Sequence, residues 1–215
     1  MTSDHAARVR GEAIPRERVA AFLSGGSASP SRGAGNCATS PNGAARADRQ
    51  RQRWATQVVI TDELARQACA QRSLAPPDVV LPMRQLTVPE PDVATLGSII
   101  AAALTHSPAA RALLTDLERE QDIPESAVRD YYDRNRDRYL TPDALRRGID
   151  PYDEPAPTDI HPYRHVRHGI ESELRQAAAH RAFFTWLDEA RAEVEYAEGY
   201  EHPGDPTHQD HEHHH

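Results

Sequence analysis

Residues 162–196, PYRHVRHGIESELRQAAAHRAFFTWLDEARAEVEY, carry apolar side chains at helical spacing almost to the end of the stretch. The repeat predicts one amphipathic helix of about 30 residues, or about 45 Å at 1.5 Å per residue. Phe183 and Trp186 widen the apolar face, so we expect other helices to surround this one. We expect residues 193–196 to form a strand that pairs with residues 8–14. The positions of the repeat are Val166, Ile170, Leu174, Ala177, Phe184, Leu187 and Val194.

The beginning of the chain predicts a short strand followed directly by a helix. Residues 8–14 alternate in polarity, with Val9 and Ile14 as apolar anchors, and Pro15 suits a first helical turn. Residues 24–47 are rich in Gly, Ser, Pro and Asn and predict a flexible insertion. Helical periodicity then returns over about residues 48–73.

The rest of the chain reads as helices separated by prolines. We expect helices over residues 96–104, 108–117 and 124–139, with breaks at 75–77 and 87–91. Residues 141–161 read as a linker, and residues 199–215 as a disordered, His-rich tail. The fold class is therefore mainly α, with a single helical domain over residues 8–198.

Three segments of this chain are similar to the SurA-type chaperone domain that accompanies parvulin peptidyl-prolyl isomerases. The first, VRGEAIPRERV from Val9, resembles the opening V-N-G-x-x-I-x-x-x-x-V, with Arg10 in place of the usual Asn. The second, from Val128 to Tyr139, resembles V-x-x-Y-Y-x-x-N-x-x-x-Y/F. The closing helix resembles P-x-x-x-V-R-x-x-I-x-x-E-L-R followed by A-F-x-x-W-L.

The resemblance implies a SurA-N-like helical domain that captures unfolded or extended polypeptide clients. Family members that carry a parvulin domain place it between the second and third of these segments, where this chain has the linker 141–161. We therefore expect a chaperone-like protein without its own catalytic residues, and an active prolyl isomerase remains the alternative. Candidate contacts to a client are Trp54, Val58, Phe183, Phe184 and Trp186.

Composition narrows the functional classes further. All 25 basic residues are Arg, which removes Schiff-base lysines and the P-loop lysine, and the net charge of −8 argues against a nucleic-acid partner. The first 15 residues lack the apolar core of a secretory signal, so we expect a cytoplasmic protein. The longest apolar run, 96–104, is too short for a membrane span. The sequence leaves a homodimer open.

Histidines and cysteines raise the question of metal binding. His161, His165 and His168 fall on one helical face, and a His-rich tail can chelate Ni²⁺, Cu²⁺ or Zn²⁺ adventitiously. Metal handling or metallocentre assembly through the tail is a further alternative, although no cofactor is required. Whether Cys37 and Cys69 pair stays open. The histidines of the tail are His202, His208, His211, His213, His214 and His215.

Overall fold

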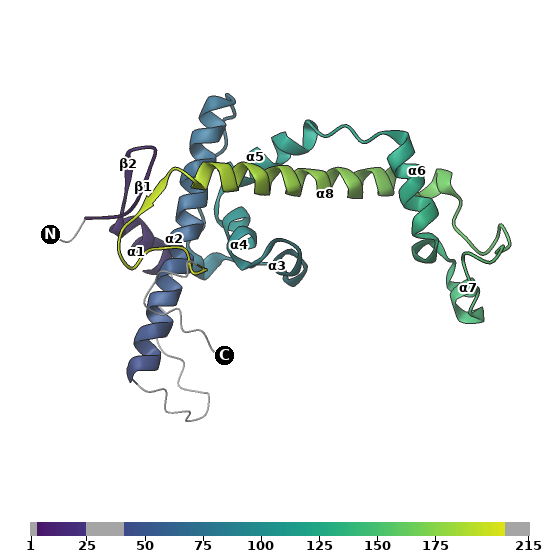
Figure 1. The fold of residues 1–215 in the computed structure, drawn as a ribbon, viewed down its shortest axis with the longest axis horizontal. Helices are drawn as coiled ribbons and strands as arrows, with labels where there is room; N and C mark the ends of the chain where they lie inside the picture. Colours follow the sequence, from purple (N-terminus) through teal and green to yellow (C-terminus); the bar gives the residue numbers. More distant parts are fainter. Residues whose placement is uncertain (1–3, 25–40, 205–215) are drawn as a thin grey trace. The chain divides into compact units, whose positions relative to one another are not determined.

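The computed structural model describes residues 4–24 and 41–204, which belong to two compact units (Figure 1). The first unit contains the described residues up to Leu113 together with those from Phe184 onward, and the second is Leu114–Phe183. The prediction of a single domain over residues 8–198 stays a prediction. Each unit is mainly helical, and the first also contains a small antiparallel sheet.

The sheet joins the two ends of the chain in the order β2-β1-β3. Its strands are β1 (His5–Val9), β2 (Glu12–Pro15) and β3 (Val194–Tyr196), and Ala7 of β1 lies opposite Tyr196 of β3. The predicted pairing of the chain ends is therefore confirmed. The prediction of one strand over residues 8–14 is wrong, because Arg10 and Gly11 adopt φ of 49° and 83° and turn the chain into a hairpin.

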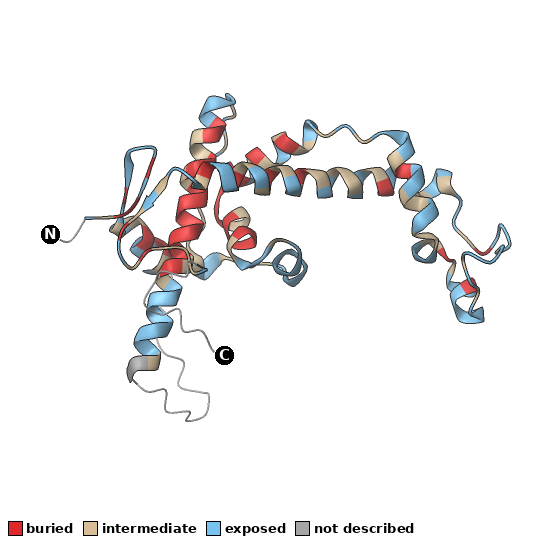
Figure 2. Ribbon diagram, in the orientation of Figure 1, coloured by how far each residue is buried: buried red, intermediate tan, exposed pale blue. Residues whose placement is uncertain are grey.

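In the first unit, a long helix contributes much of the core (Figure 2). This helix, α2 (Pro41–Gln71), packs against α1 (Arg16–Ser24) and α4 (Ser98–His106). The prediction of a flexible insertion over 24–47 is wrong for residues 41–47, which are helical, and residues 25–40 lie outside the described part. Buried apolar side chains of α2 include Val58, Val59, Ile60 and Leu64.

The connection between α2 and α5 (Pro108–Arg119) contains a 3-10 turn, η1 (Met83–Gln85), and then α3 (Glu90–Leu96) before α4. The predicted helix over 96–104 is confirmed for residues 98–104, which belong to α4, whereas Leu96 ends α3. Gly97 adopts φ of 77° and separates α3 from α4. The prolines at positions 89 and 91 suit the start of α3 because a proline needs no hydrogen-bond partner in a first helical turn.

The second unit brings together the tyrosines of the Val128–Tyr139 segment. They belong to α6 (Glu125–Arg134) and to the 3-10 helix η2 (Arg136–Tyr139). The rings of Tyr132 and Tyr139 stack at 5.1 Å, and Tyr163 meets Tyr132 edge-on at 5.4 Å. Asn135 donates from Nδ2 to the Tyr131 carbonyl at 2.7 Å and thus caps the end of α6.

Residues 141–161 form an ordered excursion whose two ends meet. Leu140 and Ile160 form an antiparallel bridge, and the Thr141 amide donates to the Asp159 carbonyl at 2.8 Å. Within the excursion lies α7 (Pro142–Arg147), with Thr141 as its N-cap. The excursion leads into α8 (Tyr163–Arg191), which matches the predicted closing helix over most of its length.

The ordered chain extends beyond the predicted boundary at residue 198. Tyr200 is buried, with the Arg16 guanidinium 5.1 Å from the centre of its ring, and Glu201 lies 3.5 Å from Nε of Arg53. The prediction of a disordered tail from residue 199 is therefore wrong for residues 199–204. The remainder of the predicted tail, 205–215, lies outside the described residues.

The end of α2 carries local strain that a substitution can test. Ser73 has a left-handed φ of 57°, and the amides of Leu74 and Ser73 donate to the carbonyls of Cys69 and Ala70 at 2.8 and 3.2 Å. These two bonds define a Schellman cap, in which glycine is preferred because it lacks Cβ.

We expect Ser73→Gly to raise the free energy of unfolding by about 0.5 kcal/mol, the relief of left-handed strain exceeding the entropy that glycine adds to the unfolded chain. Urea denaturation followed by circular dichroism measures the change. Ser73→Ala is the control, since alanine keeps the Cβ, and it should give no gain. Equal stability of the glycine and alanine variants would contradict this explanation.

Candidate functional site

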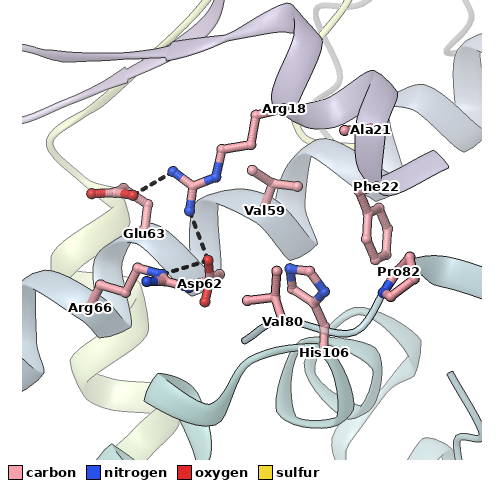
Figure 3. Close-up of a pocket in the computed structure, with 10 residues that line it drawn as sticks. All are labelled: Arg18, Ala21, Phe22, Val59, Asp62, Glu63, Arg66, Val80, Pro82 and His106. Atoms are coloured by element: carbon pink, nitrogen blue, oxygen red, sulfur yellow. Dashed lines mark hydrogen bonds and ion pairs between the residues drawn. The ribbon is translucent and has the colours of Figure 1, made fainter. Parts of the chain in front are cut away.

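A pocket of about 400 Å³ opens in the first unit between α1, α2, α4 and the segment that precedes η1 (Figure 3). Its volume lies within the range of about 300–1,000 Å³ that is usual for ligand pockets. The described residues that line it are mostly apolar on one side and charged on the other. They are Arg18, Ala21, Phe22, Val59, Asp62, Glu63, Arg66, Val80, Pro82 and His106.

The helical repeat explains why these side chains converge. Arg18, Ala21 and Phe22 follow one another at i, i+3 and i+4, so they share one face of α1. On α2 the same rule places Val59, with residues 62, 63 and 66, on the face that lines the pocket. The two helices therefore supply an apolar wall and a charged wall to the same space.

The charged wall is an ion-pair network that links α1 to α2. Arg18 donates from Nη2 to Asp62 Oδ2 at 2.7 Å and from Nη1 to Glu63 Oε2 at 2.5 Å. Arg66 donates from Nε to the same Asp62 oxygen at 3.0 Å. The Asp62 side chain is only 2% exposed, so these partners compensate a buried charge that would otherwise be costly.

The segment 78–82 forms the remaining wall and is held at both ends. Arg66 donates to the carboxylate and to the carbonyl of Asp78 at 3.3 and 3.2 Å. At the other end, the Leu81 amide donates to the His106 carbonyl at 3.1 Å. Val80 and Pro82 are thereby kept in the lining of the pocket.

His106 completes the pocket from the end of α4. Its Nδ1 lies 2.6 Å from the Leu81 carbonyl oxygen, which can only accept, so Nδ1 carries the proton and donates. In the neutral ring, Nε2 is then a hydrogen-bond acceptor. The Phe22 ring meets the imidazole edge-on at 4.8 Å.

Burial and neighbouring charges set the protonation of both acidic and basic groups here. Burial alone would raise the pKa of Asp62, but the Ser107 hydroxyl and the guanidinium groups of Arg66 and Arg18 lower it below its usual range. Burial lowers the pKa of His106, and this outweighs the Leu81 carbonyl and Asp62, which raise it. The pocket therefore holds an anionic Asp62 and a neutral His106 at neutral pH.

The lining of the pocket combines apolar and charged groups. The side chains present offer apolar contact, carboxylate oxygens, guanidinium groups and an imidazole. Such a set can hold a ligand with an apolar body and a polar group at one end.

None of the side chains expected from the sequence to contact a client lines this pocket. Val58 and Phe183 are 0% and 1% exposed, so they pack in the core and cannot touch a ligand in the folded chain. Phe184 and Trp186 are partly exposed on α8. Trp54 lies behind the pocket, with its ring 6.0 Å from that of Phe22.

The structure describes four of the histidines proposed as metal ligands, His161, His165, His168 and His202. In the part of the chain that the structure describes, no group of three or more His, Cys, Asp or Glu side chains could hold a metal ion. His165 and His168 each lie 3.2 Å from an arginine side chain, and His161 precedes α8. His202 accepts from the Gly204 amide at 3.1 Å, and the later histidines of the tail are outside the described residues.

The two cysteines differ in what the structure shows of them. The Cys69 thiol is buried on α2, and Sγ donates to the Ala109 carbonyl at 3.4 Å. Cys37 lies outside the described residues, so the question of a pairing between the two stays open.

The sequence did contain a signal for the pocket. Residues 58–66, VVITDELAR, place two acidic residues and an arginine inside an otherwise apolar helical run. Buried charges in such a run must be paired, which points to a network within a core. Nothing in the sequence, however, indicated that Arg18 or the segment 78–82 would supply the partners.

No protein-family model matches the chain, and comparisons with curated proteins and with solved structures find no match either. None of the helices in the described residues combines the length and the apolar character that crossing a membrane requires.

From the environment of His106 we predict how the stability of the folded chain depends on pH. A pKa lowered by folding means that the unfolded chain binds the proton first, so stability should fall as pH decreases through about 6.5. Chemical denaturation between about pH 7.5 and 5.5 should show this decline, and NMR titration should place the His106 pKa below about 6.5.

His106→Asn is the matched control for this prediction. Its amide nitrogen stands where Nδ1 stands and can still donate to Leu81, but it does not titrate. The variant should lose part of the pH dependence. An unchanged dependence, together with a His106 pKa at or above about 6.5, would contradict the assignment.

Proposed function

We propose that this chain binds extended segments of other polypeptides and that the pocket beside Phe22 is where they bind. The observation that carries the proposal is the pocket itself, an apolar hollow that opens on the surface next to a charged wall. Pockets with this combination hold an apolar group and fix its orientation through a few polar contacts. An unfolded polypeptide offers both, an apolar side chain and the polar backbone on either side of it.

The walls suit repeated capture and release. Val59 and Phe22 are 1% and 4% exposed, so the core holds them in place and a ligand need not order them on binding. Preformed walls reduce the entropy lost on association. Next to the pocket wall formed by Val80, Val79 is 75% exposed and extends the apolar surface.

The resemblance to SurA-type chaperone domains supports the same activity from an independent direction. Under this proposal, the hairpin β1–β2, helix α1 and strand β3 correspond to the elements that the opening and closing motifs specify in that family. The excursion 141–161, closed by the Leu140–Ile160 bridge, stands where the resemblance places the parvulin domain of other members.

The test uses Ala21, an exposed alanine of α1 that lines the pocket. Ala21→Phe should fill the hollow without disturbing the core, and we expect it to weaken binding about tenfold or more, a change of about 1.4 kcal/mol. Reduced and alkylated lysozyme, which is unfolded, serves as the titrated polypeptide, and isothermal titration calorimetry measures the affinity. Native lysozyme has the same composition in a folded state and should not bind.

Ala70→Phe is the matched control variant, because Ala70 is an exposed alanine of α2 that does not line the pocket. It should bind the unfolded polypeptide as the native chain does. If Ala21→Phe binds as tightly as Ala70→Phe, or if native lysozyme binds as well as the unfolded form, the proposed function is wrong.

A further inference from the structure

The guanidinium groups of the pocket are already engaged by carboxylates of the chain itself. Arg18 uses Nη1 and Nη2 for Glu63 and Asp62. Arg66 uses Nε for Asp62, and Nη1 and Nη2 for the carboxylate and the carbonyl of Asp78. An anionic ligand would have to break these pairs, which makes the pocket a poor anion site.

The hydrogen-bond acceptors of the pocket, by contrast, can accept further hydrogen bonds. Both arginines donate to Oδ2 of Asp62, and the Ser107 hydroxyl is a further donor to this carboxylate, whose Oδ1 is buried and receives no hydrogen bond from the arginines. Asp62 as a whole is 1% exposed. The Nε2 atom of His106 is a second acceptor on the lining, since Nδ1 donates to Leu81. A ligand group that meets Nε2 of His106 therefore needs a hydrogen-bond donor.

The net charge of the network also favours a positively charged ligand. The network contains three carboxylates, Asp62, Glu63 and Asp78, and two guanidinium groups, which leaves one net negative charge while His106 is neutral. The chain as a whole carries a net charge of −8. A surface of one sign attracts partners of the opposite sign and accelerates their association.

We propose that the pocket selects polypeptide segments in which an apolar side chain stands next to a lysine or arginine. The apolar side chain enters between Phe22, Val59 and Val80, and the cation lies against the wall formed by Asp62, Glu63 and Asp78. The Glu63 side chain is 14% exposed and that of Asp78 is 97% exposed, so a cation can reach this wall without unfolding it. This inference rests on the proposed function and adds the class of client.

The direct test compares three short peptides that differ at one residue. Each is blocked at both ends and has a central leucine followed by arginine, glutamine or glutamate. Calorimetric titration of the full chain at low salt should give affinities in the order arginine, glutamine, glutamate, with about a tenfold difference between the first and the last. The difference should shrink in about 1 M salt, where screening acts within about 3 Å.

Variants then show whether the wall causes the preference. Glu63→Gln removes one carboxylate of the network, and Glu195→Gln removes the same charge from the exposed face of β3. We expect Glu63→Gln to lower the preference for arginine over glutamate about threefold and Glu195→Gln to leave it unchanged. If Glu63→Gln impairs folding, Asp78→Asn removes a charge of the same network from an exposed side chain and should act in the same direction.

The outcomes separate this inference from the proposed function. Equal binding of the three peptides, with all of it lost in Ala21→Phe, would overturn the preference and leave polypeptide binding in place. Tighter binding of the glutamate peptide would overturn it as well. If Glu63→Gln and Glu195→Gln lower the preference for arginine equally, the preference comes from the overall charge of the chain and not from the pocket. No binding of any peptide would overturn both proposals.

Discussion

The structure of the first unit depends on the need to compensate one buried carboxylate. Asp62 lies in the middle of α2 among fully buried apolar residues, where an unpaired charge would cost several kcal/mol. Arg18 from α1 and Arg66 from the next turn of α2 supply the compensation through the same oxygen. Because Arg18 must reach Asp62, α1 is held against α2, and because Arg66 also reaches Asp78, the segment after α2 is held there too.

The pocket is a consequence of this arrangement. The ion pairs hold α1 and the segment 78–82 on the same side of α2, and His106 ties that segment to the end of α4 through Leu81. The space between them is lined by Phe22, Val59 and Val80, whose positions the network and the core maintain. A site that the fold holds in this way keeps its shape without a ligand, as the proposed function requires.

The long helices and the joining of the chain ends could be predicted from the sequence, since both leave a periodic pattern. The apolar repeat placed α8 nearly to its observed bounds, and the strand expected over residues 193–196 corresponds to β3. The hairpin turn was missed because arginine rarely adopts the positive φ that Arg10 has beside Gly11. The beginning of α2 was missed because residues 43–47 bury no apolar side chain, so their helix has no periodic signal.

The candidate site shows even more clearly which features the sequence predicts and which it does not. Of the aromatic residues that stood out in the sequence, Phe183 serves the core, because large apolar side chains are most stable where they exclude the most water. What the sequence determined by itself was the positions of the long helices, the pairing of the two chain ends and the presence of a charged patch within an apolar helix. Only the tertiary structure decided that Arg18, Asp78 and His106 meet Asp62 and its neighbours around one pocket. Helical and strand periodicities act over a few residues, whereas these partners lie on separate segments that only chain packing brings together.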